Sequence, residues 1–191
     1  FGFALGDVSG KGPAAALMAA LAQGHLGAQT NSDQGPAAAL ANLNDAIATR
    51  DADGKYATMF YGLLDPQGHL ICCNGGHNPP FLVGKNGTRR LETGGMPVGM
   101  FPGAQYEEES LTMEPGDFLV IFSDGVSEAL NADEEEFEDE RILDSIESAS
   151  DTTATAQLQH LFSSVKSFTA GAAQNDDVTV LVVRYRGEST G

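Results

Sequence analysis

The spacing of hydrophobic positions predicts helices near both ends of the chain. In the stretch from Pro36 to Thr49, Leu40, Leu43 and Ile47 recur every three or four residues, which places them on one face of a helix. Proline residues stand at the start of the first two apolar stretches, where the first helical turn tolerates them. Helices are therefore expected at residues 13–29, 36–49, 139–149 and 153–168, the last with Leu158, Leu161, Phe162 and Val165 at helical spacing.

The middle of the chain is typical of strands joined by tight turns. Apolar and polar residues alternate there, and turn sequences such as DPQG, GKNG and EPGD separate the runs. Helices at both ends of a block of hairpin-linked strands indicate an α+β fold with antiparallel sheet, because a doubly wound fold needs helices between its strands. Strands are expected at the start of the chain, where Phe1, Phe3 and Leu5 alternate with small residues, and at residues 56–64, 69–73, 80–83, 89–92, 106–111, 117–122 and 178–185.

Length and charge limit the number of domains and the kinds of partner that the chain can have. The 191 residues suffice for one domain with a substantial core, and 27 acidic against 10 basic residues give a formal net charge of −17. Such a surface repels nucleic acids and anionic membranes and favours cations or basic partners. No apolar run approaches membrane-spanning length, and the adjacent Cys72 and Cys73 would point to opposite faces of a strand, which disfavours a disulfide. We therefore expect a protein of the reducing cytoplasm.

Aspartates at the ends of apolar strands are the strongest chemical signal. Asp7 follows the first predicted strand, Asp124 follows FLVIF with one serine between, and Asp176 with Asp177 immediately precedes VTVLVV. If the last strand runs antiparallel to the other two, these carboxylates lie at one edge of a sheet. Mutual repulsion would raise their pKa values unless cations neutralise them, and an all-oxygen site suits Mg²⁺ or Mn²⁺.

Other interpretations of these motifs either remain possible or are excluded by the spacing of the residues. Each aspartate taken alone is also a common turn or helix-cap residue. The segment GDVSGKG is one residue too short for a nucleotide-binding P-loop, and Gly12 stands where that motif needs Ser or Thr. His77, in NGGHNPP, fits a structural loop role better than a site-lining one. No general base is recognisable beside Ser9 or Ser123, which argues against a serine nucleophile.

Several motifs in one order resemble bacterial PPM-type serine/threonine phosphatases of the SpoIIE/RsbU kind. They are GDVSGKGPAAALMA, YATMFYGLLD, NGGHNPPFLV, GGMPVGM, PGDFLVIFSDGVSEALN and NDDVTVLVV, and they run from Phe1 to about Arg184. The resemblance implies a layered α-β-β-α sandwich of two antiparallel sheets flanked by helices, with residues 1–186 as the phosphatase domain and 187–191 as a tail. It also implies hydrolysis of phosphoserine or phosphothreonine in proteins, with two Mn²⁺ or Mg²⁺ ions.

The same resemblance implies roles for individual residues. Asp7 would bridge both metals, the carbonyl of Val8 would be a further ligand, and Asp124 and Asp176 would complete the carboxylates. Asp177 is a second choice, since many relatives carry Asn at that position. In this mechanism a metal-activated water attacks the phosphorus, so no covalent nucleophile is needed. The segment Ser9, Gly10 and Lys11 is a candidate contact for the substrate phosphate.

Relatives carry one more metal-binding Asp in a strand that precedes the position of Phe1. The family's first hairpin is thus absent from this sequence, which would leave a sheet edge open and favour pairing with a second copy. The resemblance further implies an upstream sensory or receiver region and a phosphorylated anti-sigma-factor antagonist as substrate, with no nucleic acid and no membrane contact. Two alternatives are a pseudo-phosphatase that acts as a partner-binding module and a metal-dependent phosphodiesterase for a small molecule.

Overall fold

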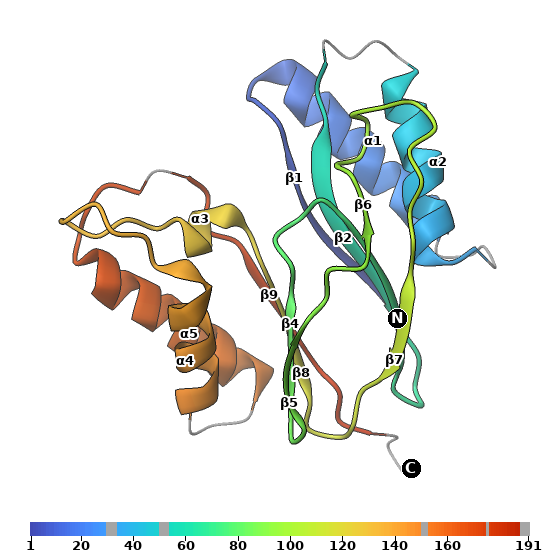
Figure 1. Cartoon of the computed structure of the whole chain (residues 1–191). Coiled ribbons are helices and arrows are strands. Elements are labelled where there is room, and N and C mark those ends of the chain that lie inside the picture. Colours follow the sequence, from blue (N-terminus) through green and yellow to red (C-terminus); the bar gives the residue numbers. More distant parts are fainter. Residues whose placement is uncertain (30–33, 50–53, 150–152, 175, 188–191) are drawn as a thin grey trace. The chain divides into compact units, whose positions relative to one another are not determined.

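A computed structural model of the chain describes all residues except 30–33, 50–53, 150–152, 175 and 188–191 (Figure 1). The chain divides into two compact units, and each consists of one sheet with its own helices. The first unit contains residues 1–77 and 92–113, and the second contains residues 78–91 and 114–191. The α+β class with two largely antiparallel sheets is therefore confirmed.

The first unit is built on a five-stranded sheet in the order β1-β2-β3-β6, with β7 also paired to β3. The pairs β1–β2, β2–β3 and β3–β7 are antiparallel, and the short β6 runs parallel to β3. The elements are β1 (Gly2–Val8), α1 (Pro13–Gln29), α2 (Pro36–Ala48), β2 (Ala57–Leu64), β3 (His69–Gly75), β6 (Gly94–Gly95) and β7 (Glu109–Thr112).

The core of this unit lies between its two helices and the sheet. The predicted face of α2 is buried, since Leu40 and Leu43 are 0% exposed and Ile47 is 3% exposed. These side chains join Met18 and Leu26 of α1, and Met59, Tyr61 and Cys73 of the sheet, in one cluster. Burial of each large apolar side chain contributes roughly 1.5–3 kcal/mol, which is far more than the propensity of either helix supplies.

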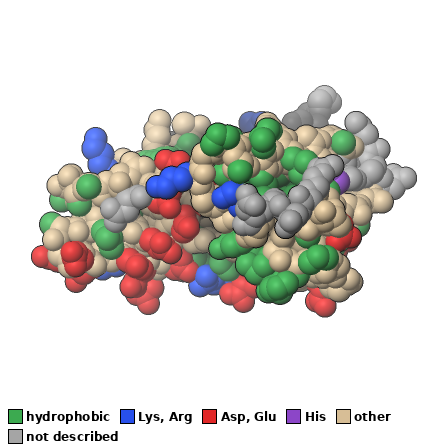
Figure 2. Space-filling view, turned by 90° about the horizontal axis from the view of Figure 1, so that it is seen from above, with side chains coloured by type: hydrophobic (Ala, Val, Ile, Leu, Met, Phe, Trp, Pro, Cys, Tyr) green, Lys and Arg blue, Asp and Glu red, His purple; other side chains and the backbone are tan. Residues whose placement is uncertain are grey.

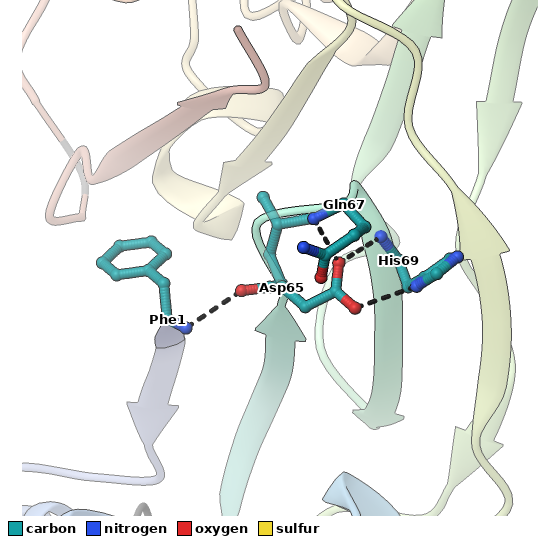
Figure 3. A network of polar contacts seen from close by, with 5 residues as sticks. Phe1, Asp65, Gln67 and His69 are labelled. Atoms are coloured by element: carbon teal, nitrogen blue, oxygen red, sulfur yellow. Dashed lines mark hydrogen bonds and ion pairs between the residues drawn. The ribbon is translucent and has the colours of Figure 1, made fainter. Parts of the chain in front are cut away.

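The turn between β2 and β3 anchors the start of β1. The ammonium group of Phe1 donates to the carbonyl of Leu64 at 2.9 Å (Figure 3). The carboxylate of Asp65 accepts from the backbone N–H groups of Gln67 at 2.9 Å and His69 at 2.8 Å, and its second oxygen lies 2.8 Å from Nδ1 of His69. These contacts lie at the end of the sheet opposite to Asp7, because Gly2 pairs with Leu63 and Asp7 pairs with Thr58.

The second unit is built on a four-stranded antiparallel sheet in the order β5-β4-β8-β9. The elements are β4 (Phe81–Gly84), β5 (Gly87–Arg90), β8 (Phe118–Phe122), α3 (Asp124–Ser127), α4 (Glu138–Ser148), α5 (Ala154–Thr169) and β9 (Val180–Arg184). Every residue of β8 is buried, and Phe122 stacks on Phe81 at a ring distance of 5.6 Å. Ile142 and Ile146 of α4 and Leu161 and Val165 of α5 cover this side of the sheet.

The structure departs from the predicted elements in a few places. The short helix α3 and the two-residue strand β6 were not expected, because neither is long enough to show a period. Strand β5 covers Gly87–Arg90 rather than 89–92, and β7 covers Glu109–Thr112 rather than 106–111. Of the helix face expected in α5, Phe162 is 40% exposed while Leu161 is buried.

The structure also describes the two cysteines and the apolar character of the helices. Cys72 and Cys73 are both buried and neither forms a disulfide, as predicted. Burial, with a smaller effect of the nearby Glu108 carboxylate, raises the pKa of the Cys73 thiol to about 12. Within the described part of the chain, no helix combines the length and the apolar character that crossing a bilayer demands.

Candidate active site

Ser123 joins the ends of β8 and β9 in the second unit. Its backbone N–H donates to the carbonyl of Thr179 at 3.0 Å, and its hydroxyl accepts from the N–H of Thr179 at 3.0 Å. The same hydroxyl donates to the carbonyl of Asp177 at 2.8 Å. Since β8 and β9 are antiparallel, with Phe122 opposite Val180, this junction brings the segments that follow β8 and precede β9 together. Asp124 and Asp176 therefore lie at one end of the same sheet.

Gly125 allows these two segments to approach closely. A β-carbon at this position would overlap the carbonyl oxygen of Asp177 and would lie 2.8 Å from its carbonyl carbon and 3.3 Å from that of Asp176. Helix α3 starts at Asp124, which is half-buried, and Gly125 and Val126 are buried. Glycine thus allows the first turn of α3 to rest directly on the backbone of the other segment.

The electrostatic potential at this end of the sheet is negative. Partial burial raises the pKa of Glu128, and the charges of Asp124, Glu136 and Asp176 raise it further, so at least four carboxylates influence one another here. Figure 2 shows acidic side chains gathered at the left of the view, over the part of the surface that belongs to α3 and the helices after it. A cation is favoured at such a place because it relieves the repulsion.

In the first unit, Asp7 lies at the end of β1 that is paired with the start of β2. It is opposite Thr58 in the register, and the two side chains therefore project from the same face of the sheet. The hydroxyl of Thr58 lies 3.3 Å from Nδ1 of His77. His77 itself is buried, and its backbone N–H and carbonyl are both bound by the side chain of Asn74. The loop role expected for His77 is confirmed, and its ring also approaches the residue paired with Asp7.

The segment after Asp7 is held in place by Ser9. Its N–H donates to the carbonyl of Tyr56 at 2.9 Å, and its hydroxyl accepts from the N–H of Tyr56 at 2.9 Å. Gly10 and Gly12 have φ values of 81° and 92°, a conformation that favours glycine. A β-carbon on Gly10 would lie 2.8 Å from Nζ of Lys55, so a second ammonium group besides Lys11 lies beside this loop. Ser9 was one of three candidate contacts for the substrate phosphate; in the structure both its N–H and its hydroxyl are engaged by the backbone of Tyr56.

The three aspartates share one local geometry. In each case the backbone N–H of the following residue donates to the Oδ1 atom: Val8 to Asp7 at 2.8 Å, Gly125 to Asp124 at 2.8 Å, and Asp177 to Asp176 at 2.7 Å. This bond holds the carboxylate close to its own backbone.

One expectation about the aspartates is wrong. They do not lie at one edge of a single sheet, because β1 belongs to the five-stranded sheet and β8 and β9 belong to the four-stranded sheet. The structure brings Asp124 and Asp176 together within the second unit and places Asp7 in the first. Among the residues that the structure describes, no three or more His, Cys, Asp or Glu side chains are grouped closely enough to hold a metal ion by themselves.

Sequence reasoning missed several residues around these aspartates. Glu128 carried a usable signal, since it stands four residues after Asp124 and would share its helical face in α3 and the turn that follows. Thr58 and Lys55 carried none, because their proximity to Asp7 and Gly10 depends on the pairing of β1 with β2. Ser123 was weighed only as a nucleophile, whereas the structure shows a link between strands.

Comparison with known proteins gives a consistent assignment. Protein IcfG of Synechocystis is 34% identical over 146 residues, which cover 75% of this chain and 23% of that protein. The phosphoserine phosphatase RsbU of Bacillus subtilis is 30% identical over 128 residues, which cover 65% of this chain and 38% of RsbU. The aligned part of the chain thus spans less than two fifths of the length of either relative.

Solved structures share the fold at lower sequence identity. The PP2C domain of SiaA from Pseudomonas aeruginosa superimposes with a TM-score of 0.83 over 96% of this chain and 75% of that domain, at 17% identity. The catalytic domain of the serine/threonine phosphatase PstP, solved with two manganese ions, gives a TM-score of 0.70 over 95% of this chain and 86% of that domain, also at 17% identity. Residues 1–186 match the family described as Stage II sporulation protein E. The chain belongs to the SpoIIE family of PPM-type phosphatase domains.

Proposed function

We propose that this chain hydrolyses phosphoserine or phosphothreonine on a regulatory protein, and that two Mn²⁺ or Mg²⁺ ions assist the reaction. The observation that carries the proposal is the junction at Ser123 and Gly125. It holds the half-buried Asp124 and the exposed Asp176 at one end of the four-stranded sheet, within a group of carboxylates. A structural role alone does not require acidic side chains to gather where they destabilise one another.

The residues suit hard divalent cations. All candidate ligands offer oxygen atoms: the carboxylates of Asp7, Asp124, Asp176 and Asp177 and the carbonyl of Val8. Partial burial raises the pKa of Glu128, and the charges of Asp124, Glu136 and Asp176 raise it further; a cation would offset the repulsion among these carboxylates. PstP, which shares this fold, was solved with two manganese ions. When bound, such ions supply a hydrolytic nucleophile at neutral pH and neutralise the charge on a phosphate.

The chain's own residues would divide the remaining work. Asp7 and Asp124 would hold the ions, Asp176 would act beside Asp124, and Val8 and Asp177 would be further ligands. In the loop of Ser9, Gly10 and Lys11, the Ser9 N–H is engaged by Tyr56, so the phosphate would be contacted by the backbone N–H groups of Gly10 and Lys11 and by the Lys11 ammonium. The Lys55 ammonium beside Gly10 adds a second positive charge for a dianionic group to approach. These cations matter because the chain as a whole repels anions.

The relatives support a proposal for the substrate and the setting. RsbU is described as a phosphoserine phosphatase, and this chain matches only part of its length. We infer that this chain is the output domain of a cytoplasmic bacterial signalling protein, with a sensory or receiver region elsewhere in the full polypeptide. A phosphorylated anti-sigma-factor antagonist is the expected class of substrate. A second copy of the chain is an expected partner, since β1 and β9 both stand at sheet edges.

Metal-dependent turnover provides the test. The chain is incubated with p-nitrophenyl phosphate and with a phosphoserine peptide, first with Mn²⁺ and then with excess EDTA. We expect turnover that requires the metal and falls by about 10²-fold or more in Asp124→Asn, because removal of a group that stabilises transition-state charge costs that much. Asp133→Asn is the matched control, since Asp133 is an exposed carboxylate between α3 and α4.

Calorimetric titration with Mn²⁺ tests the ligand set apart from activity. We expect both Asp7→Asn and Asp124→Asn to weaken or abolish Mn²⁺ binding, whereas Asp133→Asn leaves it unchanged. Turnover that persists in EDTA would rule out the two-metal chemistry. Binding of a phosphoprotein without any turnover, with Mn²⁺ present, would favour the pseudo-phosphatase alternative.

A further inference from the structure

A cavity of about 530 Å³ opens beside the Asp124 and Asp176 pair, entirely within the second unit. Its floor and walls come from the end of α3, from the exposed side of α5 and from the segment that leads into β9. Both Gly125 and Asp176 line it, so it borders the carboxylate pair directly. Its volume falls within the range of pockets that bind small ligands or peptide side chains.

Part of the lining is apolar. Phe162 of α5 lines the cavity and is 40% exposed, whereas its neighbours Leu161 and Val165 are buried. Val165, which belongs to the core cluster of this unit, and Val178, which packs against that cluster, extend this apolar wall. Ala172 and Ala173 complete it, and their small side chains leave the space open.

Another part of the lining is acidic. Glu128 and Glu136 line the cavity together with Asp176, whereas Lys166 is the lone cation among the described residues that line it. Glu128 and Glu136 are exposed at the surface, so a ligand can reach both carboxylates. A ligand that fits both walls therefore carries an apolar side chain and a positive charge close together.

We propose that this cavity receives the part of the phosphoprotein substrate next to its phosphorylated residue. The substrate places an apolar side chain against Phe162 and an Arg or Lys side chain against Glu128 and Glu136. This inference rests on the proposed function for its choice of ligand, because the cavity borders Asp176 and a peptide that fills it continues directly to the carboxylate pair. The cavity then selects among phosphoproteins, while the aspartates act on any phosphate.

The test uses four phosphoserine peptides of equal length. Next to the phosphoserine, on either side, they carry Leu and Arg, Leu and Glu, Ser and Arg, or Ser and Glu. Their kcat/KM values are measured with Mn²⁺, and dissociation constants of the unphosphorylated forms are measured by fluorescence anisotropy. We expect the Leu and Arg peptide to exceed the Ser and Glu peptide about tenfold or more in both readouts, since one apolar contact and one ion pair act together.

Two substitutions test which residues of the cavity cause the preference among the peptides. Glu136→Gln should reduce the advantage of Arg over Glu by about twofold to fivefold, the range of an exposed ion pair, and should leave the advantage of Leu over Ser intact. Phe162→Ala should remove the advantage of Leu and keep that of Arg. Glu140→Gln is the control, because Glu140 is exposed on α4 and does not line the cavity. Circular dichroism verifies that each variant is folded.

The outcomes separate this inference from the proposed function. Turnover of p-nitrophenyl phosphate without any preference among the four peptides would overturn the cavity assignment and leave the phosphatase assignment in place. A preference in binding that Glu136→Gln weakens, without turnover of any phosphate, would uphold the cavity and overturn the phosphatase. A preference that survives both substitutions unchanged also overturns the cavity assignment.

Discussion

Substitution of Gly125 by alanine tests the junction on which the site depends. The added β-carbon meets backbone atoms of Asp176 and Asp177, two of them at 2.8 and 3.3 Å, and the carbonyl oxygen of Asp177 still closer. Backbone atoms cannot rotate out of the way as side-chain atoms can, so α3 and the segment before β9 must separate. Separation also strains the bond from the Ser123 hydroxyl to the Asp177 carbonyl.

The expected change in the free energy of unfolding follows from two opposing effects. Overpacking of this kind costs about 1–3 kcal/mol. Alanine recovers roughly 0.5–1 kcal/mol over glycine inside a helix, which offsets part of the cost. Because the overlap involves backbone on both sides, we expect a net loss of about 2 kcal/mol in the free energy of unfolding. For a chain of this size that loss lowers Tm by about 4–8 °C.

Gly24→Ala makes the same chemical change where there is room for it. Gly24 lies in α1, and nothing stands within 4 Å of the position that its β-carbon would take. This variant should therefore gain about 0.5–1 kcal/mol. Thermal and urea denaturation of the two variants and the parent chain check the opposite signs. A Gly125→Ala variant as stable as the parent would show that α3 does not rest on residues 176–177 as described.

The remaining predictions concern the first unit. Glu108→Gln should destabilise the chain by about 0.5–1 kcal/mol, because the Glu108 carboxylate accepts from the N–H of Ala37 at 3.0 Å in the first turn of α2. Urea denaturation measures this loss in the free energy of unfolding. The same substitution at the exposed Glu107, Glu107→Gln, should cost less than half as much. Burial raises the pKa values of both Cys73 and Tyr106 to about 12, so these groups ionise in the unfolded chain before they do so in the folded one. The contribution of these two groups to the free energy of unfolding should therefore be constant below pH 9 and should fall between about pH 9 and pH 12. A stability profile that is flat from pH 8 to pH 11 would contradict the burial of both groups. Neither Cys72 nor Cys73 should react with a thiol reagent at pH 8 until the chain unfolds, because both are buried.

The motifs and local periods were enough to predict the class of fold and the family. The face of α2 that carries Leu40 and Leu43 was predictable because helical spacing is a property of the sequence itself. The same holds for β8, whose unbroken apolar run can only be a fully buried segment. Asp124 was identifiable as exceptional because a carboxylate one residue beyond such a strand costs free energy unless a partner meets it.

Only the tertiary structure decided which of these signals meet. Nothing local distinguishes a strand of one sheet from a strand of another, so the assignment of Asp7 to the five-stranded sheet and of Asp124 and Asp176 to the four-stranded sheet had to come from strand pairing. The proximity of Thr58 to Asp7 and of Gly125 to residues 176–177 likewise depends on the register of strands far apart along the chain. Hydrophobic periodicity is a property of each segment by itself. Strand pairing depends on which combination of segments gives the whole fold its lowest free energy.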